Sequence, residues 1–215
     1  MKLKMKLKTL SSTLLIAAPL AFSLSYASAN SDVRPIKNDA QTAGLYQVKE
    51  GNMIGNPKAK ITIIDFFDYQ CPYCRQINPV LEKLVKNNHN VRVIFKDYPK
   101  LGDRSVFSAK AALAAGEQDK YLALHQAMIT AKKPLTENEV YTLAQKAGLN
   151  TTTLKADMNK VGGQLLNNML LGTHLSIKYV PTLIISYTNT PHKAVSIVGP
   201  SEKELKKLVH NYEKV

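Results

Sequence analysis

Asp65-Phe-Phe-Asp-Tyr-Gln-Cys71-Pro-Tyr-Cys74 decides the fold of this 215-residue chain, because it joins an apolar run to a Cys-x-x-Cys motif where a helical pattern begins. Cysteines three residues apart on the first turn of a helix lie within the usual disulfide Cα separation of about 4.4–6.8 Å. The first cysteine also meets unsatisfied backbone N–H groups and the positive end of the helix dipole, which favour thiolate over thiol. Since thiolate is the species that attacks disulfides, the motif indicates a redox-active pair.

Other uses of two cysteines do not fit this chain. A structural zinc site needs four ligands, and the five histidines are scattered with no two at a ligand-pair spacing. Covalent haem attachment requires His directly after the second cysteine, where the chain has Arg75. A purely structural disulfide closing so small a loop would restrict the unfolded chain little. We expect no metal and no cofactor beyond the redox-active Cys71–Cys74 disulfide.

Residues 1–29 predict a secretory signal peptide. A basic stretch, Met1–Lys8, precedes an apolar stretch from about residue 13 to 24, and small residues follow up to a cleavage position after Ala29. The alternative is an uncleaved membrane anchor, but the apolar stretch is shorter than the ~20 residues of a membrane span and contains Pro19. Export predicts a location in the periplasm, where disulfides form and persist.

The chain is strongly basic, with a formal net charge of +13 that falls to about +9 without the four lysines of residues 1–29. A basic, solvated surface is the simplest interpretation, and a weak attraction to the membrane surface is the alternative. No basic cluster is interleaved with aromatic residues, so nucleic acid is not an expected partner. The length after cleavage is that of one ordinary domain with room for an insertion.

Hydrophobic patterns divide the chain from residue 30 onward. Residues 30–55 are expected to form an N-terminal leader and edge segment, of which the part to about residue 44 is polar, without period and predicted to be mobile. The near-continuous apolar run Lys60–Phe67 predicts a central strand covered on both faces, and Val91–Tyr98, ended by Pro99, predicts a second strand. An amphipathic helix separates them, so the three elements predict a βαβ unit with a parallel sheet.

Residues 104–178 have helical periods throughout and predict an all-helical domain. This domain would be inserted into a core formed by residues 56–103 and 179–215. The expected helices are Ser105–Ala115, Lys120–Thr130, Glu137–Ala147, Thr152–Asn159 and Gln164–Ile177.

Strand patterns return after the insert. Thr182–Tyr187 and His192–Val198 predict an antiparallel hairpin, joined by a polar turn at Thr188–Pro191. A last amphipathic helix is expected over Ser201–Tyr212. Ser201 and Glu204, three residues apart, form a capping-box signature at its start.

The chain resembles the DsbA-like thiol–disulfide oxidoreductases of the thioredoxin superfamily. The resemblance rests on Phe66-Phe-Asp-Tyr-Gln-Cys71-Pro-Tyr-Cys74, on the helical insert, and on Tyr-Val180-Pro181-Thr-Leu before the hairpin. It covers roughly Asn56 to Tyr212. It implies an α/β thioredoxin fold with an inserted all-helical domain, and an enzyme that acts as a protein disulfide oxidoreductase.

The resemblance also implies roles for the motif. The cysteine matched by Cys71 is the exposed nucleophile of the family, and the one matched by Cys74 is its buried partner. Pro72 and Tyr73, the active-site neighbours between them, mark a departure, because the strongest oxidants of the family carry Pro-His there. A histidine can help hold the thiolate, so this chain is expected to be a milder oxidant.

Two further site residues come from the resemblance alone. The proline matched by Pro181 forms a cis peptide packed against the disulfide, whereas only about 5–6% of X–Pro bonds are cis in general. The residue matched by Val180 offers backbone groups to an extended substrate. Both are therefore expected to bind substrate.

Charged and polar residues near the motif carry mixed expectations. Asp65 falls where the family often has a buried acid beneath the cysteines, which could pass a proton to or from Cys74; the alternative is a strand-end acid that reaches solvent. Asp68 is expected to be a turn or cap residue. Lys96 is a possible partner of Asp65, and His125 is expected to be a packed core histidine.

The expected function is a periplasmic dithiol oxidase that donates its disulfide to unfolded or reduced exported proteins and is reoxidised by a quinone-linked membrane protein resembling DsbB. One alternative is a reductase or isomerase that is kept reduced. Isomerases of the superfamily usually dimerise through a separate N-terminal domain, for which the roughly 25 residues before the core are too few. A non-catalytic chaperone or binding module is a further alternative, although it would have no use for paired cysteines.

Overall fold

The structure is a computed structural model that describes residues 33–36, 39–49, 51–188 and 193–214. The predicted signal peptide lies outside the described residues, as do His192 and most of the predicted turn before it. Within the part of the chain that is described, no helix combines the length and the apolar character needed to cross a membrane.

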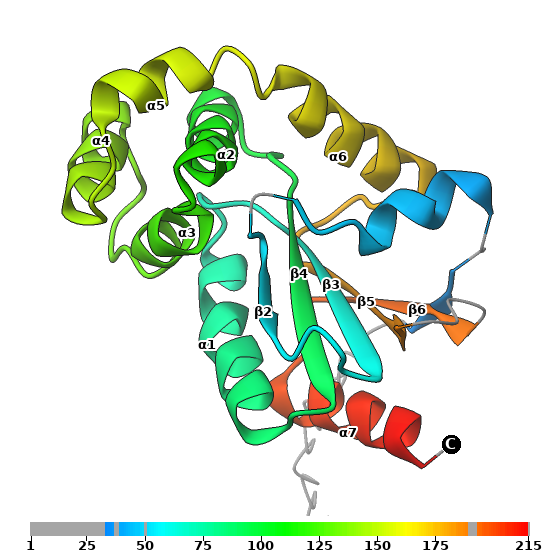
Figure 1. The fold of residues 1–215 in the computed structure, drawn as a ribbon. Coiled ribbons are helices and arrows are strands. Elements are labelled where there is room, and N and C mark those ends of the chain that lie inside the picture. The colour runs from blue at the N-terminus through cyan, green and yellow to red at the C-terminus, as the bar shows by residue number, and fades with distance from the viewer. Residues whose placement is uncertain (1–32, 37–38, 50, 189–192, 215) are drawn as a thin grey trace, which may run out of the picture. The chain divides into compact units, whose positions relative to one another are not determined.

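A six-stranded mixed sheet forms the centre of the fold, with strand order β1-β6-β5-β3-β4-β2 (Figure 1). Only β3 and β4 are parallel, and every other neighbouring pair is antiparallel. The predicted βαβ unit is confirmed by β3, α1 and β4, and the predicted hairpin by β5 and β6. The strands span Arg34–Pro35 (β1), Met53–Gly55 (β2), Ile61–Phe67 (β3), Val91–Asp97 (β4), Thr182–Tyr187 (β5) and Val195–Val198 (β6).

Side chains of β3 alternate between two cores, because successive residues of a strand face opposite sides of the sheet. Ile63 and Phe67 pack with α1 (Pro72–Asn87) and α7 (Glu202–Glu213). Ile64 and Phe66 belong to the second core, on the face covered by the 3₁₀ helix η1 (Ala40–Tyr46) and by α6 (Gly162–His174). Both faces of β3 are thus buried, as the near-continuous apolar run Lys60–Phe67 predicts.

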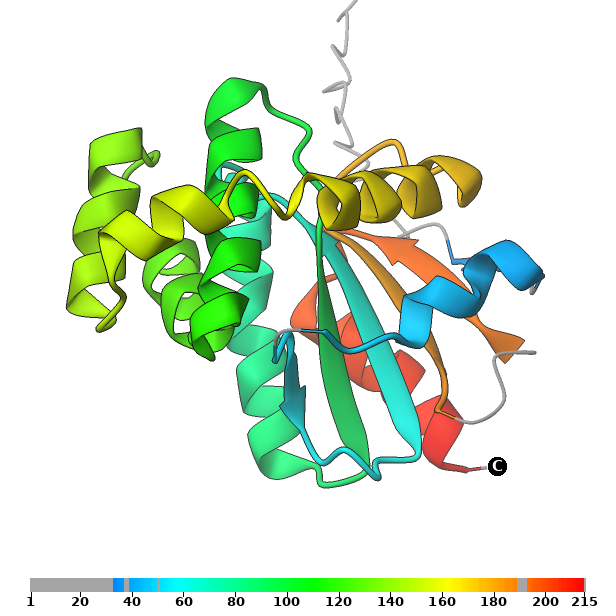
Figure 2. The same ribbon diagram turned by 45° about the horizontal axis from the view of Figure 1, so that its top comes forward.

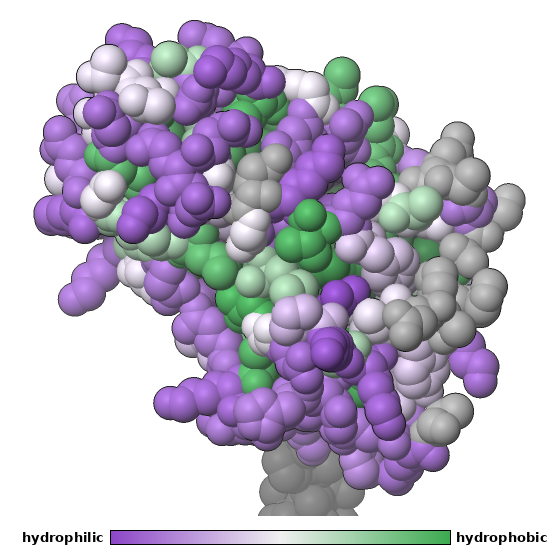
Figure 3. All heavy atoms as spheres, in the orientation of Figure 1, coloured by the Kyte–Doolittle hydropathy of each residue, from purple (hydrophilic) through white to green (hydrophobic). Residues whose placement is uncertain are grey.

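The helical insert lies between β4 and β5 and contains no strand (Figures 1 and 2). The thioredoxin fold with an inserted all-helical domain is therefore confirmed. Alanines along α2 are buried, which allows neighbouring helices to approach closely. The outer surface over α3 to α5 is predominantly hydrophilic (Figure 3). The elements are α2 (Asp103–Ala115), the 3₁₀ helix η2 (Gly116–Gln118), α3 (Tyr121–Ile129), α4 (Glu137–Lys146), α5 (Thr151–Asp157) and α6 (Gly162–His174).

The predicted leader, which has no period up to about residue 44, forms secondary structure in part of the residues described there. Arg34–Pro35 pairs with β6, and η1 (Ala40–Tyr46) buries Thr42 and Leu45. The neighbouring β2, at the sheet edge beside β4, was also not recognised as a strand. These elements are too short to show a hydrophobic period. Contacts with residues far along the chain stabilise their structure. The second hairpin strand is shorter than predicted and begins at Val195.

We predict that Gly172→Ala, in α6, destabilises the protein although alanine is the better helix former by about 1 kcal/mol. A Cβ atom at Gly172 would lie 2.3 Å from Cε2 of Tyr98, a buried ring that has no room to move. Gly163→Ala in the same helix is the matched control, because nothing lies within 4 Å of its Cβ position. Urea denaturation should show a loss for Gly172→Ala and a neutral or stabilising effect for Gly163→Ala. Equal effects would contradict the close packing of α6 on Tyr98.

Candidate active site

The end of β3 and the start of α1 place the two cysteines. Cys71 is the N-cap residue of α1, with an extended backbone (φ −78°, ψ 120°), and Pro72 occupies the first helical turn, where its missing N–H costs nothing. Cys74 lies in the same turn, and both cysteines are free thiols. The motif therefore stands at the helix start, as its pattern predicts.

The expectation of an exposed first cysteine is not met. Cys71 is only 5% exposed, compared with 1% for Cys74, because the Cys71 thiol lies against the Val180 carbonyl. Cys71 is nevertheless the more exposed of the two cysteines, as predicted. The prominent exposed side chain of the motif is Tyr73, at 65%.

The two thiols have opposite acidities. A hydrogen bond from the Cys74 thiol lowers the pKa of Cys71 to about 6, and the N–H groups of Cys74 and Tyr73 act in the same direction. Burial and the charge of Asp68 oppose this effect without reversing it. Burial raises the pKa of Cys74 far above its ordinary value. Near neutral pH the pair therefore holds one thiolate, at Cys71, and one thiol, at Cys74.

Asp65 is a buried acid on the same sheet face as the cysteines. Burial, followed by the charge of Cys71, raises the pKa of its carboxyl to about 8, and its Oδ1 has no hydrogen-bond partner among the residues that the structure describes. Asp65 in turn raises the pKa of Cys74. The interpretation as a strand-end acid that reaches solvent is wrong, because Asp65 is 2% exposed.

Lys96 does not face Asp65. In the parallel register Asp65 is paired with Phe95 and Phe66 with Lys96, so the two charged side chains leave opposite faces of the sheet. The Lys96 ammonium instead donates to the carbonyls of Gly44 and Gln47, each at 3.0 Å. The possible Asp65–Lys96 pair is therefore a wrong expectation, since a strand alternates its side chains.

The segment before β5 meets the first cysteine. The Val180–Pro181 peptide is cis, as the resemblance implies. Sγ of Cys71 lies 3.5 Å from the Val180 carbonyl oxygen, to which the thiol donates when it is protonated, and the two residues are 109 positions apart. A small cavity of about 200 Å³ adjoins this contact and is lined by Tyr73, Ile77 and Pro181, among others.

Asp68 is a turn residue, as predicted. Its carboxylate accepts hydrogen bonds from the backbone N–H groups of Gln70, Lys100 and Leu101, at 2.7–3.0 Å. These contacts tie the loop before the cysteines to the loop after β4. The second set of contacts could not be foreseen from the sequence.

Gln70 and Arg75, which flank the motif, were not identified as site residues. The Gln70 side-chain amide exchanges two hydrogen bonds with the backbone of Leu135, at 2.9 and 3.0 Å. Arg75 donates to the carbonyls of Tyr69, Ala131 and Lys133. Together they fasten the motif to the loop between α3 and α4. No local pattern signals these contacts, because the partners lie about 60 residues away.

His125 is a packed core histidine, as predicted. Burial lowers its pKa to about 3, so the ring is neutral. Its Nδ1 lies 3.0 Å from the Tyr69 hydroxyl and its Nε2 lies 3.3 Å from Oδ1 of Asn78.

Nearby, the Asp97 carboxyl accepts a hydrogen bond from Tyr121 at 2.9 Å, and burial raises its pKa to about 7.

Three comparisons place the chain among known proteins. A family model described as thioredoxin matches residues 47–198. A thioredoxin-like oxidoreductase from Silicibacter pomeroyi DSS-3 is 30% identical, with a TM-score of 0.72 over 83% of this chain and 99% of that one. A periplasmic thioredoxin-like protein from Salmonella enterica serovar Typhimurium is 25% identical, with a TM-score of 0.64 over 81% of this chain and 97% of that one.

Curated relatives extend the comparison. The thiol:disulfide interchange protein DsbA of Burkholderia cepacia is 31% identical over 52% of each chain. Several Na⁺/H⁺ antiporters of the NhaA type also match, but the chain spans only 15–26% of their length. From the family model, the fold and the cysteine motif together, the chain belongs to the thioredoxin family and is similar to its DsbA-like thiol–disulfide oxidoreductases.

Proposed function

We propose that the chain is a periplasmic dithiol oxidase that donates a Cys71–Cys74 disulfide to reduced exported proteins. The observation that carries the proposal is the contrast between the two thiols. The fall of the Cys71 pKa from 9.0 to about 6 favours the thiolate at this sulfur. Stabilising a thiolate of the reduced form favours that form, and so makes the disulfide a better oxidant.

The reaction is a pair of thiol–disulfide exchanges. A client thiolate attacks Sγ of Cys71, a client–Cys71 disulfide forms, and Cys74 leaves as thiolate. A second client thiolate then attacks the client sulfur of the mixed disulfide, and Cys71 leaves as thiolate. The client loses two electrons and becomes a disulfide, while the enzyme becomes the dithiol. The low pKa of Cys71 makes it the better leaving group in the second step.

Asp65 supplies a proton to Cys74 in this scheme. With a pKa of about 8 its carboxyl is mostly protonated near neutral pH, and burial makes a thiolate at Cys74 costly. The neutral acid can therefore donate its proton as Cys74 leaves, and recover one when the dithiol is reoxidised. The raised pKa matches the acid to this task.

Val180 and Pro181 would receive the client backbone. The Val180 carbonyl already lies at the Cys71 sulfur, and the exposed Tyr73 borders the small cavity beside Pro181. An extended peptide alongside Val180 would bring its cysteine to Cys71. A quinone-linked membrane oxidase resembling DsbB would then restore the disulfide. The periplasmic neighbour and the predicted signal peptide support the location.

We predict that Cys71 reacts first with iodoacetamide when the reduced protein is alkylated across a range of pH. Its rate should rise with a midpoint near pH 6, because the thiolate is the reactive form. Peptide mass mapping identifies the modified cysteine, and a Cys71→Ser variant should be almost unreactive. Comparable rates at both thiols, or a midpoint near 8.5, would contradict the assignment.

We predict that Asp65→Asn removes the Asp65 contribution to the pH dependence of stability between about pH 4 and 8 and leaves that of Asp97, whose pKa burial also raises. The unfolded chain releases this proton near pH 3.8, whereas the folded protein keeps it to about pH 8, so unfolded chains bind fewer protons and stability falls as pH rises. The variant should be more stable than the parent at pH 8 by a few kcal/mol. Urea denaturation at several pH values measures this, with the exposed Asp119→Asn as control. Parallel curves would show that Asp65 is not a buried neutral acid.

We predict a reduction potential between the thioredoxin value near −270 mV and the DsbA value near −120 mV, in the upper half of that range. Equilibration with glutathione buffers measures it. Tyr73→His should raise the potential by on the order of 30 mV, about 1.4 kcal/mol, because the added donor stabilises the thiolate. Tyr73→Phe is the matched control and should leave it unchanged. A value at or below −270 mV would favour the reductase or isomerase instead.

We predict that the cysteine pair is mostly oxidised in living cells. Acid quenching and alkylation with a mass-adding maleimide would separate the disulfide from the dithiol on a gel. Loss of a membrane oxidase of the proposed kind should shift the pair to the dithiol. A pair that is reduced in otherwise unaltered cells would reject the oxidase role.

A further inference from the structure

Arg75, the residue after the second cysteine, carries a positive charge at the start of α1. Its backbone N–H donates to the Cys71 carbonyl at 3.2 Å, so the residue belongs to the first turn of the helix. Side chains of a helix tilt toward its N-terminus, and Nε of Arg75 donates to the carbonyl of Tyr69, two residues before Cys71, at 3.0 Å. The guanidinium therefore lies back over the helix start, beside the cysteine motif.

A positive charge is unexpected at this place. The N-terminal end of a helix carries a partial positive charge, which disfavours a cation and favours an anion. Fastening the loop between α3 and α4 does not require a charge either, because the neutral side chain of Gln70 bonds the backbone of the same loop. The charge of Arg75 therefore needs a reason beyond the hydrogen bonds that its side chain makes to that loop.

The guanidinium forms no salt bridge with any acid that the structure describes. Its Nε and Nη1 donate to main-chain carbonyls, whereas Nη2 is buried and has no hydrogen-bond partner among the described residues. The charge of Asp68 acts on Arg75, but the oxygens of that carboxylate accept hydrogen bonds from three backbone N–H groups. A half-buried cation with unused N–H groups is costly unless an anion lies near it.

Cys71 supplies such an anion in the reduced protein, where it is the thiolate of the pair. Burial lowers the pKa of Arg75, and the charges of Asp68, Cys71 and Cys74 act in the opposite direction. Because the attraction between two charges is mutual, a thiolate that stabilises the guanidinium is itself stabilised by it. Asp65 and Asp68, the acids that act on the pair, have the opposite effect on the thiolate.

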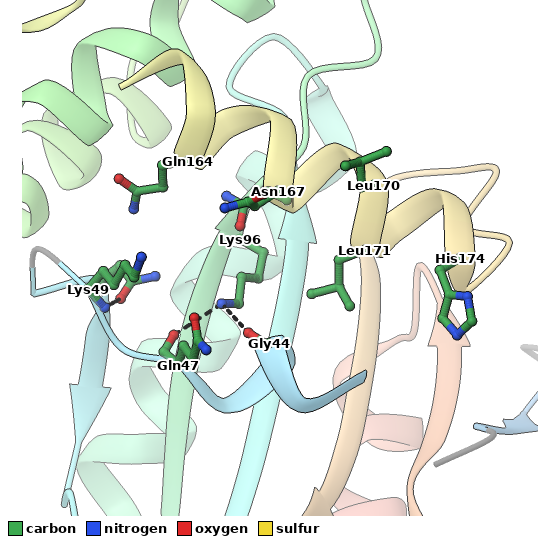
Figure 4. Close-up of a pocket in the computed structure, with 11 residues that line it drawn as sticks. Gly44, Gln47, Lys49, Lys96, Gln164, Asn167, Leu170, Leu171 and His174 are labelled. Carbon is green, nitrogen blue, oxygen red and sulfur yellow. Dashed lines mark hydrogen bonds between the residues drawn. The ribbon is translucent and has the colours of Figure 1, made fainter. Parts of the chain in front are cut away.

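Lys96 is a buried cation that does not take this role. Its side chain projects from the opposite face of the sheet from Asp65 and donates to the carbonyls of Gly44 and Gln47 (Figure 4). There it lines a cavity of about 540 Å³ between α6 and the segment from η1 to β2. The sheet therefore separates Lys96 from the cysteines.

We propose that the Arg75 guanidinium is the counter-charge of the Cys71 thiolate and so a positioning residue for the exchange reaction. The inference rests on the proposed function, since it concerns the thiolate that the second exchange releases. In the disulfide form Cys71 carries no charge, and the guanidinium loses this partner. Reduction by two electrons, with a proton on Cys74, restores the thiolate. Arg75 therefore favours the dithiol and makes the disulfide a stronger oxidant.

Titration of the reduced protein, followed by the ultraviolet absorbance of the thiolate, tests the proposal. The parent should titrate with a midpoint near pH 6. Arg75→Gln should raise this midpoint by about 0.5–1 unit, whereas Arg75→Lys, which keeps a charge, should stay within about 0.3 unit of the parent. In the parent, about 1 M KCl should raise the midpoint as well, because salt screens the charge of Arg75.

Equilibration with glutathione gives a second measurement. Two glutathione thiols pass two electrons to the Cys71–Cys74 disulfide and become glutathione disulfide. A rise of the Cys71 pKa by about 0.5–1 unit from about 6 should lower the equilibrium constant for forming the dithiol at pH 7 about two- to sixfold in Arg75→Gln.

Two control variants separate the charge from a structural role. Gln70→Ala removes hydrogen bonds to the same loop without changing the charge, so it should lower stability in urea and leave the midpoint at the parent value. Lys83→Gln removes an exposed charge farther along α1 and should also leave the midpoint unchanged.

The proposal is overturned if Arg75→Gln titrates like the parent, or if Gln70→Ala raises the midpoint as much as Arg75→Gln does. Should Arg75→Gln not fold, a parent midpoint that is independent of salt would overturn it. A parent midpoint near 8.5 would reject the thiolate itself, and with it both this proposal and the proposed function.

Discussion

The start of α1 is the constraint on which the site depends. A sulfur at the N-cap of a helix meets N–H groups that have no partner within the helix, and here it also receives a hydrogen bond from the second cysteine of the same turn. Both effects favour charge at Cys71 and leave the proton at Cys74. Strand β3 ends just before this helix start, and the Val180 carbonyl oxygen contacts the Cys71 sulfur. Displacing the helix start would separate all of these groups.

Burial without a charged partner sets the proton chemistry behind the cysteines. Asp65 and Asp97 lie on strands of the sheet, and burial raises the pKa of both carboxyls into the neutral range. Oδ2 of Asp97 accepts a hydrogen bond from the Tyr121 hydroxyl, and Oδ1 of each acid has no hydrogen-bond partner among the residues that the structure describes. An acid so placed is costly to fold and useful as a proton reservoir. The cost and the proposed role have the same physical origin.

Side chains at both ends of the motif hold the insert against the core. The Gln70 side chain forms two hydrogen bonds with the backbone of Leu135, and Arg75 donates hydrogen bonds to two carbonyls of the same loop. The Asp68 carboxylate accepts hydrogen bonds from two backbone N–H groups of the loop after β4. The cysteines therefore lie between three polar contacts that join distant parts of the chain. This arrangement limits how the insert can move relative to Cys71.

Local patterns in the sequence determined the βαβ unit, the helices of the insert, the Ser201 capping box and the cysteine motif at a helix start. Each depends on residues within a few positions of one another, so period and spacing suffice to predict it. Only the tertiary structure decided that Cys71 is buried and that the side chains of Lys96 and Asp65 project from opposite faces of the sheet. It also decided that η1, β1 and β2 form secondary structure. These features depend on contacts such as the one between Cys71 and Val180, which are 109 residues apart. A pattern of neighbouring residues in the sequence carries no information about such contacts.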